Sequence, residues 1–240
     1  MKSIDVCLTP ELLHLYPVEG KTVVVVDILR ATSVMTTAIA HGIKEIIPVK
    51  TIAECRDLKN AGCLAAAERN GEMQEGFDFG NSPFSYMGKE IKGKTLAITT
   101  TNGTVAIKNS EDADEIVIGS FLNISAVKNY LLEKSNDILI LCAGWKGRVN
   151  LEDTLFAGAL IEMLKDDFEL NHDGALVAHS IFVNAGDDKL KFLNGCSHFK
   201  RLANLNIQKD IEFCLEHDVY DVVPVVLNGK VVVLNELVSA

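Results

Sequence analysis

The chain has 240 residues, of which 48% are hydrophobic, so it can form one large or two small domains with a sizeable core. Its formal net charge of -10 argues against broad binding to a nucleic-acid backbone. No segment approaches the roughly 20 apolar residues of a membrane span, and no signal peptide is recognisable. The six cysteines form no C-x-x-C pair, which excludes a redox motif and favours reduced thiols. We expect a cytoplasmic protein with no nucleic-acid or membrane partner.

Strand and helix patterns alternate along the chain. Apolar runs predict strands at 21–27, 45–49, 63–68, 94–100, 115–120 and 137–142. Amphipathic stretches predict helices at 33–41, 51–62, 124–134, 151–165, 174–184, 189–205 and 209–217. Thr51 and Glu54 form a capping box for the second of these helices. Near the C-terminus, strands at 222–227 and 230–234 flank Asn228-Gly229, a strong hairpin signal.

This alternation predicts the α/β class, as a three-layer α/β/α fold with a mixed, largely parallel sheet and a C-terminal hairpin. The stretch 70–83 contains glycines and a proline and predicts a loop. No linker, repeat or low-complexity tract divides the chain, so we expect residues 1–240 to form a single domain. The composition leaves a homo-oligomer open.

The most informative segment is the valine run Val23–Val26, which is followed by Asp27, Arg30 and Thr32. Four valines suit a strand that is buried on both faces, and Thr32 is expected to cap the next helix. Ligands of open α/β sheets bind beyond the carboxyl ends of the strands. An acid, an arginine and a helix N-terminus at that place suit a metal ion together with an anionic group.

Four segments share this layout of strand, polar or glycine-rich turn and helix. They are 27–33, 65–71, 99–104 and 142–147. If the strands are parallel, all four turns lie at one edge of the sheet. Each segment alone is more often a local ion pair, cap or turn, so the prediction of a site depends on their convergence.

The side chains of these turns suggest distinct roles. Asp27 and Glu68 carry the hard oxygen ligands that Mg²⁺ takes, while Arg30 and Arg69 could grip phosphate or carboxylate oxygens. The turn 101–104 offers hydroxyls, an amide and backbone N–H groups that can form an anion nest. The glycines of the last turn, at 144 and 147, would let the backbone approach a ligand closely.

Cys142 and Arg148 have the spacing with which tyrosine-phosphatase loops cradle a phosphate over a thiolate. The residue before the cysteine is Leu141 where those loops carry a histidine, and the charges of Glu152 and Asp153 would oppose phosphate at the following helix. A small buried strand-end cysteine is the competing interpretation. No P-loop, dinucleotide fingerprint or nucleophile elbow is present.

Taken together, these segments resemble the 2-phosphosulfolactate phosphatase family, in order over about residues 4–225. The motifs that carry the resemblance are Val-Val-Asp-Ile-Leu-Arg-Ala-Thr-Ser (25–33), Glu-Arg-x-Gly (68–71), Phe-Gly-Asn-Ser-Pro (79–83), Thr-Thr-Thr-Asn-Gly-Thr (99–104), and Ala-Gly-x-x-Gly (143–147) with Glu152-Asp153. The resemblance implies a Mg²⁺-dependent phosphatase with an α/β/α fold unlike that of the common phosphatases. Its substrate would be the phosphate ester of a 2-hydroxy acid that bears a sulfonate, on a route toward coenzyme M.

We therefore expect hydrolysis of 2-phosphosulfolactate to sulfolactate and phosphate, with Mg²⁺ held by Asp27 and Glu68. Arg30 would stabilise the transferred charge, and Glu152 or Asp153 would act as general base or further metal ligand. The residues expected to bind phosphate or the acid groups of the substrate are Thr32, Arg69, Asn81, Thr101, Asn102, Gly103, Thr104, Gly144, Lys146 and Gly147.

Two alternatives remain at the level of sequence. One is a phosphatase that depends on Cys142 as its nucleophile. The other is a non-catalytic binding protein for an anionic phosphorylated metabolite, although a pure anion receptor gains nothing from four acids near its ligand. Arginine and backbone N–H groups bind sulfonate and carboxylate alike, so the residues leave the acid group of the substrate open.

Overall fold

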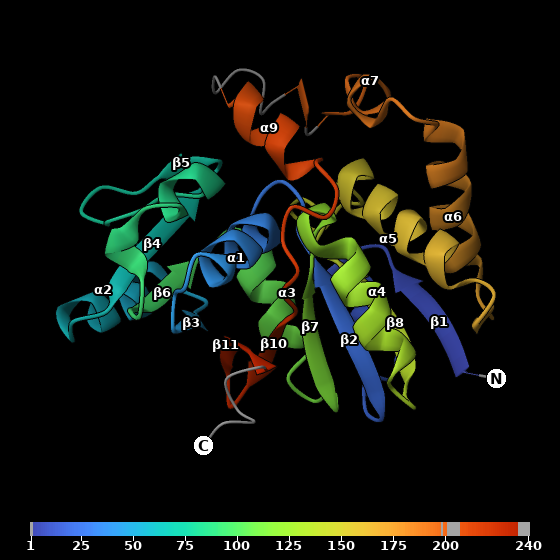
Figure 1. The fold of residues 1–240 in the computed structure, drawn as a ribbon, viewed down its shortest axis with the longest axis horizontal. Coiled ribbons are helices and arrows are strands. Elements are labelled where there is room, and N and C mark those ends of the chain that lie inside the picture. The colour runs from blue at the N-terminus through green and yellow to red at the C-terminus, as the bar shows by residue number, and fades with distance from the viewer. Residues whose placement is uncertain (1, 198, 201–206, 235–240) are drawn as a thin grey trace.

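The computed structural model describes residues 2–197, 199–200 and 207–234, and its eleven strands form one sheet with the order β5-β4-β6-β3-β11-β10-β7-β2-β8-β1-β9 (Figure 1). The strands are β1 (Lys2–Cys7), β2 (Lys21–Val26), β3 (Glu45–Pro48), β4 (Leu64–Arg69), β5 (Glu72–Met73), β6 (Thr95–Thr99), β7 (Glu115–Gly119), β8 (Asp137–Cys142), β9 (Phe168–Leu170), β10 (Pro224–Leu227) and β11 (Lys230–Val233). The α-helices are α1 (Ala31–Ala40), α2 (Ile52–Asn60), α3 (Gly103–Asn109), α4 (Ile124–Leu132), α5 (Leu151–Leu164), α6 (Asp173–Ala185), α7 (Lys189–Leu193) and α9 (Gln208–Cys214).

The sheet consists of two parallel groups joined by an antiparallel hairpin. One group is β7-β2-β8-β1-β9 and the other is β4-β6-β3. The hairpin β10–β11 lies between them and pairs antiparallel with β7 on one side and with β3 on the other. Three successive antiparallel pairs reverse the strand direction three times, so the two groups run in opposite senses along the sheet.

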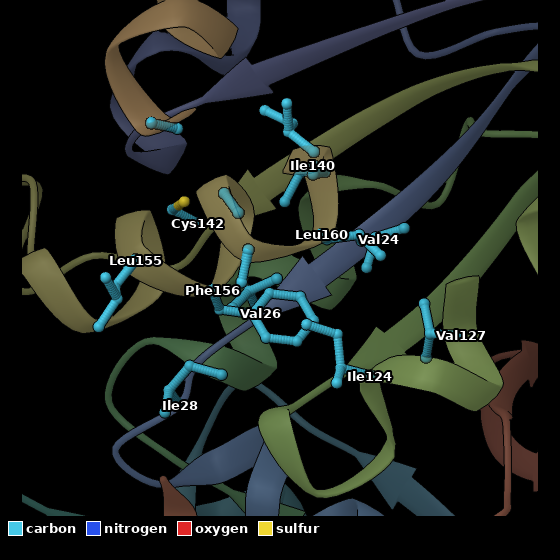
Figure 2. Close-up of a cluster of buried hydrophobic side chains, with 14 of the residues drawn as sticks. Val24, Val26, Ile28, Ile124, Val127, Ile140, Cys142, Leu155, Phe156 and Leu160 are labelled. Carbon is cyan, nitrogen blue, oxygen red and sulfur yellow. The ribbon is translucent and has the colours of Figure 1, made fainter. Parts of the chain in front are cut away.

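The core lies on both faces of this sheet. Val24 and Val26 of β2 pack with residues of α4, α5 and α6, and Figure 2 shows part of this cluster. Val23 and Val25 point to the other face, where they pack with α1 and α3. All four valines are fully buried, and burial of each such side chain stabilises the folded state by roughly 1.5–3 kcal/mol. The strand buried on both faces is therefore confirmed.

The predicted fold class, a largely parallel α/β sheet with a C-terminal hairpin, is confirmed. The capping box of Thr51 and Glu54 is present at α2. The predicted helix 189–205 is represented by α7, and its part at 201–205 lies outside the described residues. Among the helices of the described part, none is long and apolar enough to cross a membrane.

Some details differ from the sequence predictions. Helix α1 begins at Ala31 with Arg30 at its N-cap, so Thr32 is not the cap; its hydroxyl accepts a hydrogen bond from the Asp27 N–H at 3.0 Å. The segment 65–71 is followed by strand β5 and not by a helix, because Asn70 and Gly71, both with positive φ, turn the chain back on itself. Strand β1 was not predicted.

Candidate active site

The segments that follow β2 and β6 meet where α1 and α3 begin, although the two strand groups run in opposite senses. Gly103, the first residue of α3, lies so close to β2 that an added Cβ would be 2.8 Å from Asp27 Oδ2 and 2.6 Å from the Cβ of Ala31. Only a glycine fits there without displacing one of them. The condition that would bring all four turns to one edge, parallel strands throughout, is not met because of the hairpin, yet the turns after β2 and β6 are in contact.

Glu68, at the end of β4, belongs to the same junction. Its carboxylate accepts hydrogen bonds from the N–H of Thr101 at 3.1 Å and from the Thr101 hydroxyl at 3.2 Å. It also accepts a hydrogen bond from the N–H of Gly71, in the turn to β5. Asp27 and Glu68, the two predicted metal ligands, therefore both contact the turn 101–103.

Arg30 is buried and its guanidinium is held from two sides. It forms an ion pair with Asp210 of α9 and donates a hydrogen bond to the carbonyl of Gly71 at 3.1 Å. The second carboxylate oxygen of Asp210 accepts a hydrogen bond from the Ser82 hydroxyl at 3.0 Å. Sequence reasoning missed Asp210, because one acid in a short polar helix gives no local signal.

Asp153 connects the ends of two strands. Its Oδ1 accepts a hydrogen bond from the N–H of Ile28 at 2.8 Å, and its Oδ2 accepts one from the N–H of Gly144 at 3.1 Å and one from Asn150 at 2.9 Å. Because the first bond places it beside Asp27, and Glu152 is its neighbour in α5, three buried carboxylates gather here. We refer to Asp27, Glu152 and Asp153 as the carboxylate cluster.

The electrostatics of the carboxylate cluster follow from this crowding. Burial and the negative charges of Asp27 and Glu152 raise the pKa of Asp153, against the opposing effect of the hydrogen bonds from Ile28 and Asn150. A cation at this place would relieve the repulsion.

Lys146 joins three of the predicted turns. Its ammonium donates a hydrogen bond to Asn70 Oδ1 at 3.0 Å, and its backbone N–H donates one to Asn102 Oδ1 at 3.2 Å. The loops after β4, β6 and β8 are therefore tied together at one place. Lys146 is exposed, so its side chain also faces solvent at this junction.

Other predicted residues have contacts that account for their positions without a ligand. Thr104 exchanges hydrogen bonds with Thr100 within the start of α3. Arg69 donates to the Glu68 carbonyl at 2.6 Å and to the Thr99 hydroxyl at 3.0 Å, within the β4-β6-β3 group. Its role as a substrate ligand remains a prediction.

Gly144 and Gly147 both have positive φ and fit tightly against other parts of the chain. A Cβ at Gly144 would lie 2.4 Å from the carbonyl oxygen of Arg148, and one at Gly147 would lie 2.9 Å from the side chain of Glu11. Their lack of a side chain is therefore needed for the shape of the loop itself. Close approach of a ligand to this loop remains a prediction.

A cavity of about 660 Å³ includes Arg30 in its lining. Its lining is formed by Arg30, Gly71, Met73, Gly80, Asn81, Ser82, Phe84, Ser85, Ile207, Gln208, Lys209 and Asp210. Asn81 is buried, and among the described residues its Oδ1 has no hydrogen-bond partner. Of the residues predicted for the site, Arg30 and Asn81 line this cavity, whereas Asp27 does not.

The geometry argues against Cys142 as a nucleophile. Its side chain is fully buried in the core cluster that contains Leu155 and Phe156 (Figure 2). Burial raises the pKa of its thiol well above the ordinary value of 9.0, and the nearby charge of Asp153 adds to this effect. The Cys142 sulfur is therefore a protonated core group at neutral pH.

An α/β sheet whose strand ends gather buried carboxylates, a paired arginine and turn amides has the parts of a hydrolase that acts on an anionic substrate. The sequence profile described as 2-phosphosulpholactate phosphatase matches residues 7–229. The chain therefore belongs to the 2-phosphosulfolactate phosphatase family and is a phosphoric monoester hydrolase by class.

Several relatives resemble the chain over nearly its whole length. Proteins of Thermotoga petrophila and Thermotoga maritima, each named probable 2-phosphosulfolactate phosphatase, are 44% identical over 226 residues, which cover 94% of this chain and 96% of each relative. A protein of the same name from Clostridium acetobutylicum is 40% identical over 235 residues, or 95% of this chain and 99% of the relative. The family resemblance predicted from the motifs is confirmed.

Proposed function

We propose that this protein is a Mg²⁺-dependent phosphatase that converts 2-phosphosulfolactate to sulfolactate and inorganic phosphate. The observation that carries the proposal is the carboxylate cluster of Asp27, Glu152 and Asp153, buried at the ends of β2 and β8 near Arg30. The names of the relatives suggest the substrate. Sulfolactate formed in this way would feed a route toward coenzyme M. The six free thiols agree with a cytoplasmic location.

The residues fit a magnesium ion. Three buried carboxylates leave negative charge that a divalent cation would neutralise, because Arg30 is already paired with Asp210. The described residues include no group of three or more His, Cys, Asp or Glu side chains arranged to hold a metal. Mg²⁺ does not require one, since it usually keeps several waters and takes one or two carboxylates. Asp27 and Glu68 would hold the ion, since both contact the turn 101–103.

The chemistry can be assigned to the groups of this junction. When bound, the metal would polarise the phosphoryl oxygens of the substrate. Arg30 and the donors of the turn 101–104 would bind the oxygens on which charge grows in the transition state. Glu152 or Asp153 would act as the general base or as a further metal ligand. Asn81 and Lys146 would bind the acid group that is not transferred.

The test is release of inorganic phosphate from 2-phosphosulfolactate and from phospholactate, each with EDTA and after Mg²⁺ is restored. We expect turnover that EDTA abolishes and Mg²⁺ recovers, with the sulfonate substrate preferred. Failure to observe metal-dependent turnover on any phosphorylated 2-hydroxy acid would refute the proposal. If phospholactate is the better substrate, the proposed reaction still holds, but the acid group that the enzyme recognises is a carboxylate and not a sulfonate.

A further inference from the structure

We propose that Asp210 is a positioning residue, which holds the Arg30 guanidinium in the orientation that binds the substrate phosphate or its second acid group. This inference rests on the proposed function, since it assigns Arg30 to anion binding. It makes α9, which is far from Arg30 in the sequence, a structural part of the site. In the view of Figure 1, α9 lies between β5 and α5, next to the strand ends.

Asp210 contacts two other segments directly and a third through Arg30. One carboxylate oxygen pairs with Arg30, and the other accepts the hydrogen bond of Ser82. Arg30 in turn donates to the carbonyl of Gly71, whose N–H donates to Glu68. A continuous chain of polar contacts therefore runs from α9 to Glu68, one of the two carboxylates proposed to hold the metal.

Burial makes this arrangement rigid. The side chain of Arg30 is 4% exposed and that of Asp210 is 10% exposed, so water competes little for either charge. A planar guanidinium that is held by two acceptors has few orientations left, and Arg30 lines the same cavity as Asn81 and Lys209. Fixing the donors in advance lowers the cost of binding an anion.

The sign of a mutational effect separates positioning from simple electrostatics. Asp210→Asn removes a negative charge beside a proposed anion site, so Coulomb attraction alone would make phosphate bind more tightly. If Asp210 orients Arg30, the same change lets the guanidinium turn away and phosphate binds more weakly. A helix-anchoring role alone would change the melting temperature and leave binding by the folded protein unaffected.

The experiment is calorimetric titration of the whole protein with inorganic phosphate in the presence of Mg²⁺, together with KM and kcat for 2-phosphosulfolactate. For Asp210→Asn we expect phosphate affinity roughly 10- to 100-fold weaker, as for loss of one partner of a buried charge pair, with KM affected more than kcat. Asp210→Glu should recover part of the affinity. Glu212→Gln, an exposed acid on the same helix, is the matched control and should bind phosphate like the wild type.

The double variant Arg30→Lys/Asp210→Asn should bind phosphate no more weakly than Arg30→Lys alone, because both changes disrupt the same pairing of Arg30 with Asp210. Unchanged or tighter phosphate binding by Asp210→Asn, fully additive losses, or a wild type that binds no phosphate would overturn the proposal. If Asp210→Asn does not fold, Ser82→Ala is measured in its place. We expect its phosphate affinity to be severalfold weaker, and an unchanged affinity would contradict the proposal. Because the titration does not depend on turnover, it can fail or succeed independently of the proposed reaction.

Discussion

Asp27 lies where its charge is expected to reduce the stability of the folded protein. It is buried beside Asp153, and its charge helps to raise the pKa of that carboxyl, so the folded protein keeps two carboxylates close together. A raised carboxyl pKa means that the folded state favours the protonated form, and stability falls as the pH rises through that pKa. Repulsion of this kind is the expected cost of a preformed cation site.

The first prediction follows from this arrangement. Asp27→Asn keeps the shape of the side chain and removes the repulsion, so in the absence of metal it should melt at the same temperature as the wild type or higher. Turnover should fall roughly 100-fold or more, as with loss of a key electrostatic group. Mg²⁺ at 100 times its dissociation constant should stabilise the wild type by about 2.7 kcal/mol and so raise its melting temperature. It should not raise the melting temperature of the variant. Near-normal activity with a normal Mg²⁺ titration would remove Asp27 from the site.

Cys142 provides a second prediction at this scale. Because its thiol stays protonated and buried, Cys142→Ser should retain most of the turnover of the folded enzyme. The new hydroxyl enters an apolar cluster, so the variant should lose roughly 1–3 kcal/mol of unfolding free energy. Cys142→Ala, which buries no polar group, is the control for that cost. Turnover abolished in both variants while they still melt cooperatively would restore the thiolate mechanism.

At the scale of elements, the hairpin β10–β11 shows what a sequence can and cannot predict. Asn228 and Gly229 have φ of 51° and 75°, the conformation that a two-residue hairpin turn requires, so the turn was predicted from local chemistry. The place of the hairpin inside the sheet depends on pairing with β7 and β3, which are distant in sequence. No local pattern carries that information.

The same distinction applies to the rest of the fold and site. Strands with continuous apolar runs were found, whereas β1 was missed because Lys2 and Asp5 interrupt its pattern. Glu152 and Asp153 were predicted as site residues because they lie shortly after a glycine-rich turn. Asp210 was missed because its importance comes only from contacts with Arg30 and Ser82, which are 180 and 128 residues away.

The third prediction concerns the attachment of the hairpin. Hydrogen bonds from Lys230 and Thr95 hold the pKa of Glu45, on β3, below its ordinary value of 4.5. The lowered pKa means that this stabilisation is present above the unfolded-state pKa and is lost as the pH falls through the folded-state value. Glu45→Gln should therefore cost about 0.5 kcal/mol at neutral pH, since Lys230 is partly exposed, and almost nothing near pH 3. Urea unfolding at both pH values measures this, and an equal cost at both would contradict the ion-pair explanation.

At the scale of the whole molecule, the question is whether the two strand groups unfold together. Between the groups, the hairpin pairs Val225 with Val117 and Val231 with Ile46. Arg30 and Gly71 add a contact across the site, and α1 contacts both β7 and the hairpin. These links are few but all are buried or lie at the site, so we expect one cooperative domain.

Two buried thiols test this expectation directly. Cys55 belongs to α2 and packs against β4 and β6, and Cys142 lies in the core beside β2, so each reports on one strand group. Both are fully buried and should react with an alkylating reagent only after unfolding, with equal opening free energies that match the global value from denaturant. Cys63, which is half-buried, is the control and should react faster in the native state.

Val231→Ala, which truncates a buried side chain of the hairpin, should lower both opening free energies equally, by roughly 2 kcal/mol. If Cys55 opens at a lower free energy than Cys142, or responds alone to Val231→Ala, the β4-β6-β3 group is an independent unit, and the active site lies between two units that can separate.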